Sequence, residues 1–269
     1  LSIRRQRQMC IRDRALNNLD LKKLGRLHSV DDAMLALEVA HHHFDRVSFD
    51  LIYGRQNQSL SSWEAELTRA ISLSSGHLSL YQLTIEPGTA FGYRASAGKL
   101  TGLPNEDLSA DMFEFTDTTC ALAGLNSYEV SNFSSEGLES KHNLIYWMGG
   151  DYIGIGPGAH GRITSDNQRL ATKTMLSPAA WLDTVHLKSS GELTPDILSK
   201  TDHANELIMM GLRLKGGISQ SRIEAMVGKK FNITTELTDL GLLDISDGFI
   251  RATNSGRALL NQVIQKLMF

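Results

Sequence analysis

The chain has 269 residues, a net charge of −3 at pH 7, 41% apolar residues and 21% charged residues. This length allows one large α/β domain, or a medium-sized domain followed by a small one. The small net charge argues against nucleic acid or a membrane surface as an electrostatic partner. We find neither an apolar run of roughly 18 residues nor a secretory signal, and therefore expect a cytoplasmic protein without stable membrane insertion.

Only two cysteines are present, Cys10 and Cys120. They are too few for a disulfide framework and too far apart in sequence to be a metal-ligand pair. An iron–sulfur cluster is normally held by several closely spaced thiolates. We therefore expect no metal ligands in this chain.

The first 14 residues, LSIRRQRQMCIRDR, are rich in arginine and have no apolar period. A basic nucleic-acid-binding arm is one interpretation, but such arms usually extend a complete domain. Here the stretch adjoins a pattern typical of the middle of a helical region. We therefore interpret residues 1–14 as a non-native leader and exclude them from the fold prediction.

Helical and strand patterns alternate from residue 16 to residue 163. We expect strands at 46–54, 77–84 and 127–130, and helices at 16–27, from Ser29, from Ser61 and at 105–125. The nearly continuous apolar run RVSFDLIYG at 46–54 is typical of a parallel strand covered on both faces. Asp50 interrupts this run and is either paired in the core or directed toward a ligand; we favour the ligand. The alternation predicts an α/β fold with too few strands to close a barrel.

The most distinctive stretch is HNLIYWMGGDYIGIGPGAHG at 142–161. It carries an imidazole, an amide, a phenol and an indole within six residues: His142, Asn143, Tyr146 and Trp147. A predicted apolar strand at 152–155 leads into a glycine-rich turn at 156–161, where the backbone can approach a ligand closely. The pattern alone leaves two interpretations open, a binding site and an aromatic-rich hairpin that serves stability.

Beyond residue 164 the pattern is mainly helical. We expect helices at 179–189, 201–214, from 219, at 232–241 and at 253–267, with a small β-wing at 242–251. Helix, helix, wing and helix is the order of a winged-helix module, for which DNA binding is the functional interpretation. Acidic residues offset its basic ones, which is too weak a basic face for phosphate contacts, and we predict no nucleic-acid partner.

The sequence resembles the HemW family, relatives of the oxygen-independent coproporphyrinogen III oxidases among the radical S-adenosylmethionine (radical SAM) enzymes. The matching stretches are LKKLGRLHS at 21–29, FDLIYGRQNQ at 49–58, HLSLYQLTIEPGTAFG at 77–92, YEVSNF at 128–133 and HNLIYWMGGDYIGIGPGAHG at 142–161. The resemblance implies an incomplete, TIM-like radical SAM partial barrel over 15–165. It also implies a small helical, winged-helix-like domain over 166–269.

The resemblance further implies a haem chaperone, which binds haem and delivers it to haem-accepting proteins such as respiratory enzymes. It assigns haem binding to the HNxxYW residues: His142, Asn143, Tyr146 and Trp147. Neutral imidazole is a usual axial ligand of haem iron, and tyrosine and tryptophan rings can cover a porphyrin plane. The alternative for His142 is a core histidine bonded to the backbone.

In the radical SAM relatives, S-adenosylmethionine lies across the carboxyl ends of the strands, and the resemblance carries its contacts over to this chain: Arg26, Asp50, Gly156, Gly158 and His160. The family's CxxxCxxC motif, which holds a [4Fe–4S] cluster, does not occur in this sequence. We therefore expect a haem carrier with no catalytic residue. The alternatives are a coproporphyrinogen III oxidase of porphyrin biosynthesis and a winged-helix DNA-binding regulator.

Overall fold

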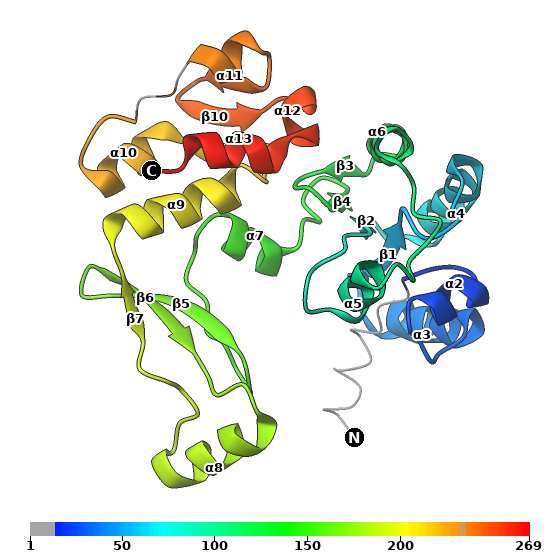
Figure 1. Cartoon of the computed structure of the whole chain (residues 1–269), viewed down its shortest axis with the longest axis horizontal. Helices are drawn as coiled ribbons and strands as arrows, with labels where there is room; N and C mark the ends of the chain where they lie inside the picture. The colour runs from blue at the N-terminus through cyan, green and yellow to red at the C-terminus, as the bar shows by residue number, and fades with distance from the viewer. Residues whose placement is uncertain (1–13, 232, 234) are drawn as a thin grey trace. The chain divides into compact units, whose positions relative to one another are not determined.

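The computed structural model describes residues 14–231, 233 and 235–269. The chain divides into two compact units between Glu139 and Ser140, which we call unit 1 and unit 2 and describe separately (Figure 1). Most of the predicted leader lies outside the described residues. Arg14, its last residue, forms a parallel bridge with Leu51, so this residue takes part in the sheet of unit 1.

Unit 1 contains a four-stranded sheet with the strand order β1-β2-β4-β3. The strands are β1 (Phe49–Tyr53), β2 (His77–Gln82), β3 (Asn126–Ser127) and β4 (Asn132–Ser134). β1 and β2 are parallel, whereas β4 is antiparallel to both of its neighbours. The expected strand at 127–130 is wrong beyond Ser127, because the buried Glu129 carboxylate accepts hydrogen bonds from the backbone N–H of Ser131 and the amide of Asn132 and thereby closes a turn.

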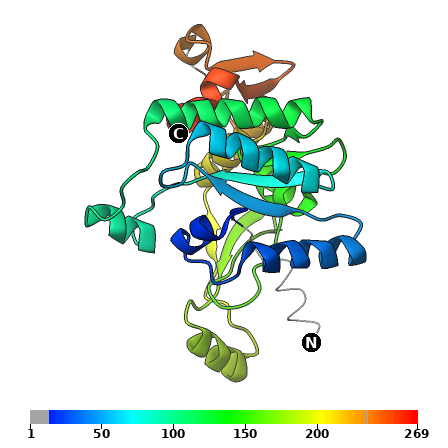
Figure 2. The same ribbon diagram turned by 90° about the vertical axis from the view of Figure 1, so that its right-hand side faces the viewer.

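Two helices of unit 1, α4 (Leu60–Leu73) and α6 (Glu106–Leu122), cover one face of this sheet. The other helices of this unit are α2 (Asn18–Lys23), α3 (Val30–His43) and α5 (Ala90–Ser96), and α5 has no buried residue. Figure 2 shows α4 and α6 side by side along the sheet. Trp63 of α4 stacks on Tyr53 of β1 and donates a hydrogen bond to Thr116 of α6 (2.8 Å). Phe49, Leu51 and Tyr53 point into this core.

The other face of the sheet is polar. Asp50, Ser79 and Asn132 occupy paired positions on β1, β2 and β4, and the Ser79 hydroxyl donates to the Asn132 side chain (2.7 Å). The strand predicted at 46–54 is parallel to its neighbour, as expected, but it is fully buried on only one of its two faces. Asp50 and Ile52 are only half-buried, because their side chains face this polar side.

Helix starts agree with the cap residues in the sequence. Ser29 and Asp32 form a reciprocal capping box at the start of α3. Ser59 caps α4 and Asn105 caps α6. The first helix is shorter than predicted, since α2 ends before Gly25, which adopts a positive φ of 70°.

Unit 2 begins with α7 (Lys141–Trp147) and a second sheet of strand order β5-β6-β7. The strands are β5 (His160–Ser165), β6 (Gln168–Lys173) and β7 (Asp196–Leu198), and α8 (Pro178–Lys188) lies between β6 and β7 in the chain. The sequence prediction missed the β5–β6 hairpin and expected helices beyond residue 164. The turn residues of this hairpin, Asp166 and Asn167, both have positive φ, as a type I′ hairpin turn requires.

The expected strand at 152–155 is also wrong. Only Tyr152 pairs, through an isolated bridge to Arg162. Ile153 and Ile155 are 69% and 89% exposed, so their apolar side chains do not enter the core of unit 2.

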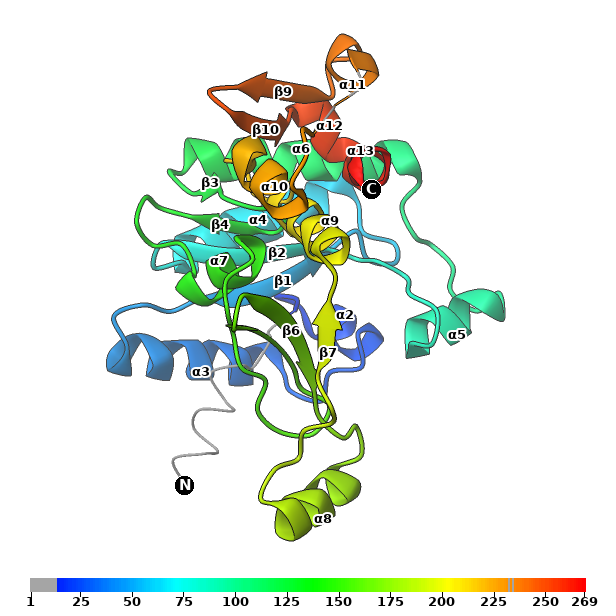
Figure 3. The same ribbon diagram turned by 90° about the vertical axis from the view of Figure 1, so that its left-hand side faces the viewer.

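The C-terminal part of unit 2 has the predicted winged order. It comprises α9 (Lys200–Gly211), β8 (Ile218–Ser219), α10 (Gln220–Val227), α11 (Thr235–Asp239), β9 (Leu243–Ser246), β10 (Phe249–Ala252), α12 (Asn254–Ala258) and α13 (Leu260–Leu267). Figure 3 shows α10, α12 and α13 grouped with β9 and β10. β8, β10 and β9 form a third sheet. The expected last helix is interrupted at Leu259, and Thr253 caps its first part, α12.

Candidate functional site

The helix α7 carries all four residues of the HNxxYW motif. Ser140 caps it by accepting a hydrogen bond from the backbone N–H of Asn143. His142 and Tyr146 are one helical turn apart and therefore share a face. The Tyr146 hydroxyl lies 3.0 Å from Nε2 of His142, and the two rings meet edge to face with centroids 4.7 Å apart.

His142 is exposed, whereas Asn143, Tyr146 and Trp147 are half-buried. The described structure thus argues against the alternative of a core histidine. Burial, followed by the neighbouring Tyr152, raises the pKa of Tyr146 above its usual value. Its phenol therefore stays protonated near neutral pH. The imidazole of His142 is the group of this motif that is suited to bind a metal ion from solution.

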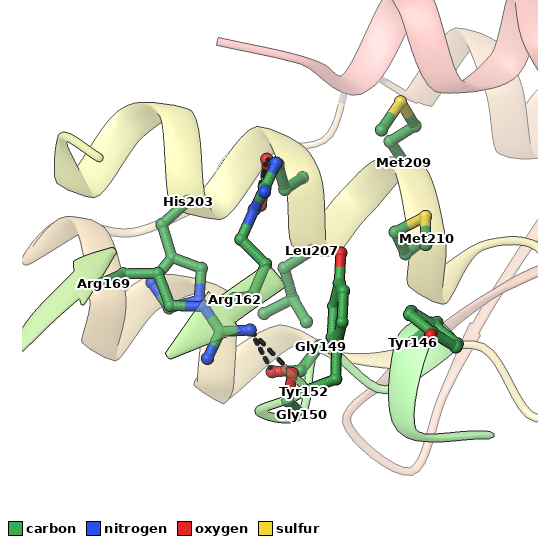
Figure 4. Close-up of a pocket in the computed structure, with 11 residues that line it drawn as sticks. Tyr146, Gly149, Gly150, Tyr152, Arg162, Arg169, His203, Leu207, Met209 and Met210 are labelled. Carbon is green, nitrogen blue, oxygen red and sulfur yellow. Dashed lines mark hydrogen bonds and ion pairs between the residues drawn. The ribbon is translucent and has the colours of Figure 1, made fainter. Parts of the chain in front are cut away.

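A pocket of about 100 Å³ lies beside α7 (Figure 4). Its walls come from α7, the segment at 149–152, the β5–β6 hairpin and α9. Tyr146, Tyr152, Leu207, Met209 and Met210 give it an apolar side. The rings of Tyr146 and Tyr152 pack edge to face with centroids 4.3 Å apart, which links α7 to the following segment. The polar side consists of Arg162, Arg169, His203 and Glu206.

Arg162 and Glu206 form a two-pronged ion pair on the polar side. The Nε of Arg162 donates to both carboxylate oxygens of Glu206 (3.1 and 3.0 Å), and Nη2 donates to one of them (2.6 Å). This pairing raises the pKa of Arg162. Because Glu206 is on α9 and Arg162 on β5, the pair fixes one element against the other.

Arg169 holds the segment at 149–151 in place. It is only 6% exposed, donates to the carbonyl oxygens of Gly149 (3.2 Å) and Gly150 (2.8 Å), and pairs with Asp151. Burial, with the Arg169 charge as the next cause, lowers the pKa of His203. His203 is therefore neutral near pH 7.

The glycine-rich turn has a structural explanation in this chain. Gly156 and Gly158 have φ values of 97° and 68°, which favour glycine. The Gly158 N–H donates to the Met175 carbonyl (2.8 Å), and the Gly156 carbonyl accepts from Thr174 (2.6 Å). His160 is exposed at the start of β5. Contacts of this turn with S-adenosylmethionine stay a prediction.

Arg26 and Asp50 belong to unit 1, whereas Gly156, Gly158 and His160 belong to unit 2. Arg26 is half-buried, and its Nε is buried without a hydrogen-bond partner. Asp50 is the second residue of β1, next to Ser79. Its charge is the second cause, after burial, of the raised pKa of Tyr81.

The described cysteine does not fit an iron–sulfur cluster. Cys120 is fully buried in the core of unit 1, and burial raises the pKa of its thiol to about 12. The ligands of an iron–sulfur cluster are thiolates, and burial in an apolar core disfavours the thiolate form. Cys10 lies outside the described residues. Within the described ranges, no group of three or more His, Cys, Asp or Glu side chains is placed to hold a metal ion.

Sequence reasoning missed the polar side of the pocket. His203, Glu206 and Met210 recur on α9 at intervals of three and four residues, which predicts a shared helix face but not what that face contacts. Arg162 and Arg169 were not predicted as site residues, because the β5–β6 hairpin that carries them was not predicted. In the part of the chain that the structure describes, no helix has the length and apolar character needed to cross a membrane.

Comparison with known proteins first shows the fold class to which the chain belongs. The fold matches the Escherichia coli coproporphyrinogen III oxidase HemN, described as a radical SAM enzyme, with a TM-score of 0.72 over 95% of this chain and 62% of that one, at 17% identity. The model of the HemN C-terminal domain family matches residues 198–259. The chain thus has a HemN-like radical SAM fold with a HemN-type C-terminal domain.

Two relatives define the family more closely. The heme chaperone HemW of Bacillus subtilis is 32% identical over 90% of this chain, and the mitochondrial radical S-adenosyl methionine domain-containing protein 1 of Dictyostelium discoideum is 34% identical over 94% of it. The chain belongs to this HemW-like family, as the resemblance predicted. It spans 64% of the length of each of these two relatives.

Proposed function

We propose that this chain binds haem through His142 on α7 and transfers it to haem-accepting proteins such as respiratory enzymes. The observation that carries the proposal is the exposed imidazole of His142, held on one helix face with Tyr146 beside a pocket with an aromatic and thioether side. The relative from Bacillus subtilis that is named a heme chaperone supports the assignment.

The surroundings of His142 suit a ligand that must be given up again. The imidazole has one hydrogen-bond partner on its Nε2, the Tyr146 hydroxyl, and iron can replace it at a small cost. Tyr146 and Trp147 are half-buried and offer flat faces to a porphyrin. An exposed iron ligand is also open to ligand exchange with an acceptor protein.

In the longer family proteins, we propose that S-adenosylmethionine contacts the positions predicted above: Arg26, Asp50, Gly156, Gly158 and His160. The buried Nε of Arg26 has no hydrogen-bond partner and suits a carboxylate of that molecule. When bound with a cluster, S-adenosylmethionine supplies radical chemistry in such proteins. We propose haem carriage rather than porphyrinogen oxidation for this chain, since the likeness to the oxidase is one of fold.

The test is a titration of the chain with ferric haem, followed by Soret absorbance. The loss of partners outside the ligand shell already lowers metal affinity roughly 10- to 100-fold. His142→Gly, which removes the ligand itself, should therefore weaken haem binding by at least that factor. His186→Gly is the matched control, because His186 is an exposed histidine in a helix of the same unit. Equal affinity of both variants would contradict the proposal.

A further inference from the structure

Two buried nitrogen atoms without a hydrogen-bond partner belong to residues that line the pocket beside α7. They are Nε of Arg169 and Nε2 of His203. Arg169 is more than nine-tenths buried, so water does not substitute freely for the missing partner. Buried polar groups in folded proteins are nearly always paired, and two residues in one pocket wall that each hold an unpaired nitrogen indicate a missing acceptor, with the proton of His203 on Nε2.

The charges around this pocket favour an anion as that acceptor. Three guanidinium groups are close to it: Arg162 and Arg169 in its wall, and Arg222, which donates to the carbonyls of Met148 (2.6 Å) and Gly149 (3.5 Å). Two carboxylates, Glu206 and Asp151, oppose them. The three guanidinium groups therefore exceed the two carboxylates by one positive charge. Burial, followed by the charge of the nearby Arg169, lowers the pKa of Arg222.

The size and the two sides of the pocket narrow the choice of anion. About 100 Å³ admits a carboxylate on a short chain but not a porphyrin ring. Figure 4 shows Arg169 and His203 on one side and Tyr146, Met209 and Met210 on the other. A ligand that fits both sides has an apolar body beside Tyr146 and a carboxylate that reaches the nitrogen atoms.

We propose that this pocket binds a propionate carboxylate of the haem that His142 ligates, with Arg169 and His203 as its hydrogen-bond donors. The inference rests on the proposed function. The connection is short, because Tyr146 both lines the pocket and contacts His142. The site thus selects a porphyrin with free carboxylates. The methionine carboxylate of S-adenosylmethionine has the same chemistry, and the experiment separates the two sources.

The experiment compares ferric haem with its dimethyl ester, in which both propionate charges are removed, in titrations of the full chain. We expect the free acid to bind roughly tenfold more tightly than the ester, because the ester lacks the charged hydrogen bond that the carboxylate makes in the buried site. His203→Leu should lower this preference by roughly two- to tenfold, because it removes one of the two proposed donors and leaves Arg169 in place. His186→Leu, the control, should keep the preference. Arg169 is not varied, because it also holds the backbone at 149–150.

The preference ratio is insensitive to partial unfolding, which lowers both affinities together. If the wild type binds neither porphyrin, the proposed function itself fails. If it binds both equally, or if His203→Leu keeps the full preference, haem binding stands and the propionate assignment is overturned. A further outcome is that free S-adenosylmethionine competes with haem and that this competition is lost in His203→Leu. The pocket would then bind the methionine carboxylate of S-adenosylmethionine, and the propionate assignment would be overturned.

Discussion

Tyr146 and His142 share one hydrogen bond, so the tyrosine hydroxyl and a haem iron compete for Nε2 of the imidazole. Tyr146→Phe removes the hydroxyl but keeps the aromatic ring. Because one such bond contributes about 0.5–1.5 kcal/mol, we expect this variant to bind haem roughly two- to tenfold more tightly. Soret titration measures the change. Weaker binding would mean that the hydroxyl contacts the bound haem instead.

His77 gives unit 1 a dependence on pH. The ring is buried between the Ser48 hydroxyl (2.6 Å from Nδ1) and the Tyr128 hydroxyl (2.9 Å from Nε2). Burial, and then the charge of Arg46, lowers the pKa of His77 from 6.5 to about 4. Between these two pH values His77 takes up a proton in the unfolded chain but not in the folded chain. The contribution of neutral His77 to stability is therefore fully present above pH 6.5 and is lost as the pH falls toward 4.

The loss attributable to His77 should reach about 3 kcal/mol. Urea unfolding at pH 7 and pH 4.5 measures it, with His77→Gln as the comparison. The variant lacks this titration, so its free energy of unfolding should fall less over the same interval. An equal fall in both proteins would show that His77 is not the group responsible.

At the scale of the elements, the glycine-rich turn joins the site to its supporting hairpin. A Cβ atom at Gly161 would lie 2.4 Å from the Thr172 hydroxyl on the paired strand β6. Gly161→Ala should therefore lower the free energy of unfolding by about 1–3 kcal/mol, as overpacking does. Gly216→Ala is the control, because nothing lies within 4 Å of a Cβ there and its φ is not positive.

Thermal or urea unfolding of the two alanine variants decides this prediction. A Gly161→Ala protein as stable as Gly216→Ala would mean that the hairpin shifts at no cost. If Gly161→Ala weakened S-adenosylmethionine binding but left the free energy of unfolding unchanged, the turn would serve the ligand rather than stability.

Prediction from sequence succeeded where an element had both a period and a cap. The helix predicted from Ser61 is α4, whose apolar face holds Trp63 and Leu67 and which starts one residue earlier, at Leu60. The β5–β6 hairpin was missed because its buried positions hold Gly161, Arg169 and Thr172 rather than apolar residues. The strand at 152–155 was predicted from isoleucines that the fold leaves exposed.

The same limit applies to the site. The HNxxYW spacing predicts which side chains share a helix face, and the resemblance gives them a role. The partners of that face are distant in sequence: Arg162 follows a turn, and His203 and Glu206 lie on α9. The unpaired Nε2 of His203 and the ion pair between Arg162 and Glu206 exist only in the folded chain, so no local pattern could reveal them.

At the scale of the whole molecule, the two units carry different parts of the predicted machinery. Unit 1 has Arg26 and Asp50, and unit 2 has the haem motif, the glycine-rich turn and the HemN-type C-terminal domain. Within that domain, Arg222 of α10 is engaged by the backbone carbonyls of Met148 and Gly149. This gives one basic residue of the winged module a structural role.

The central claim is that His142 supplies the haem ligand, and imidazole rescue tests it most directly. His142→Gly is mixed with ferric haem, and the absorption spectrum is recorded before and after free imidazole is added. We predict an altered Soret band that returns to the wild-type position with imidazole, because the free ring can occupy the vacated position on the iron. A wild-type spectrum of His142→Gly without imidazole would contradict the claim.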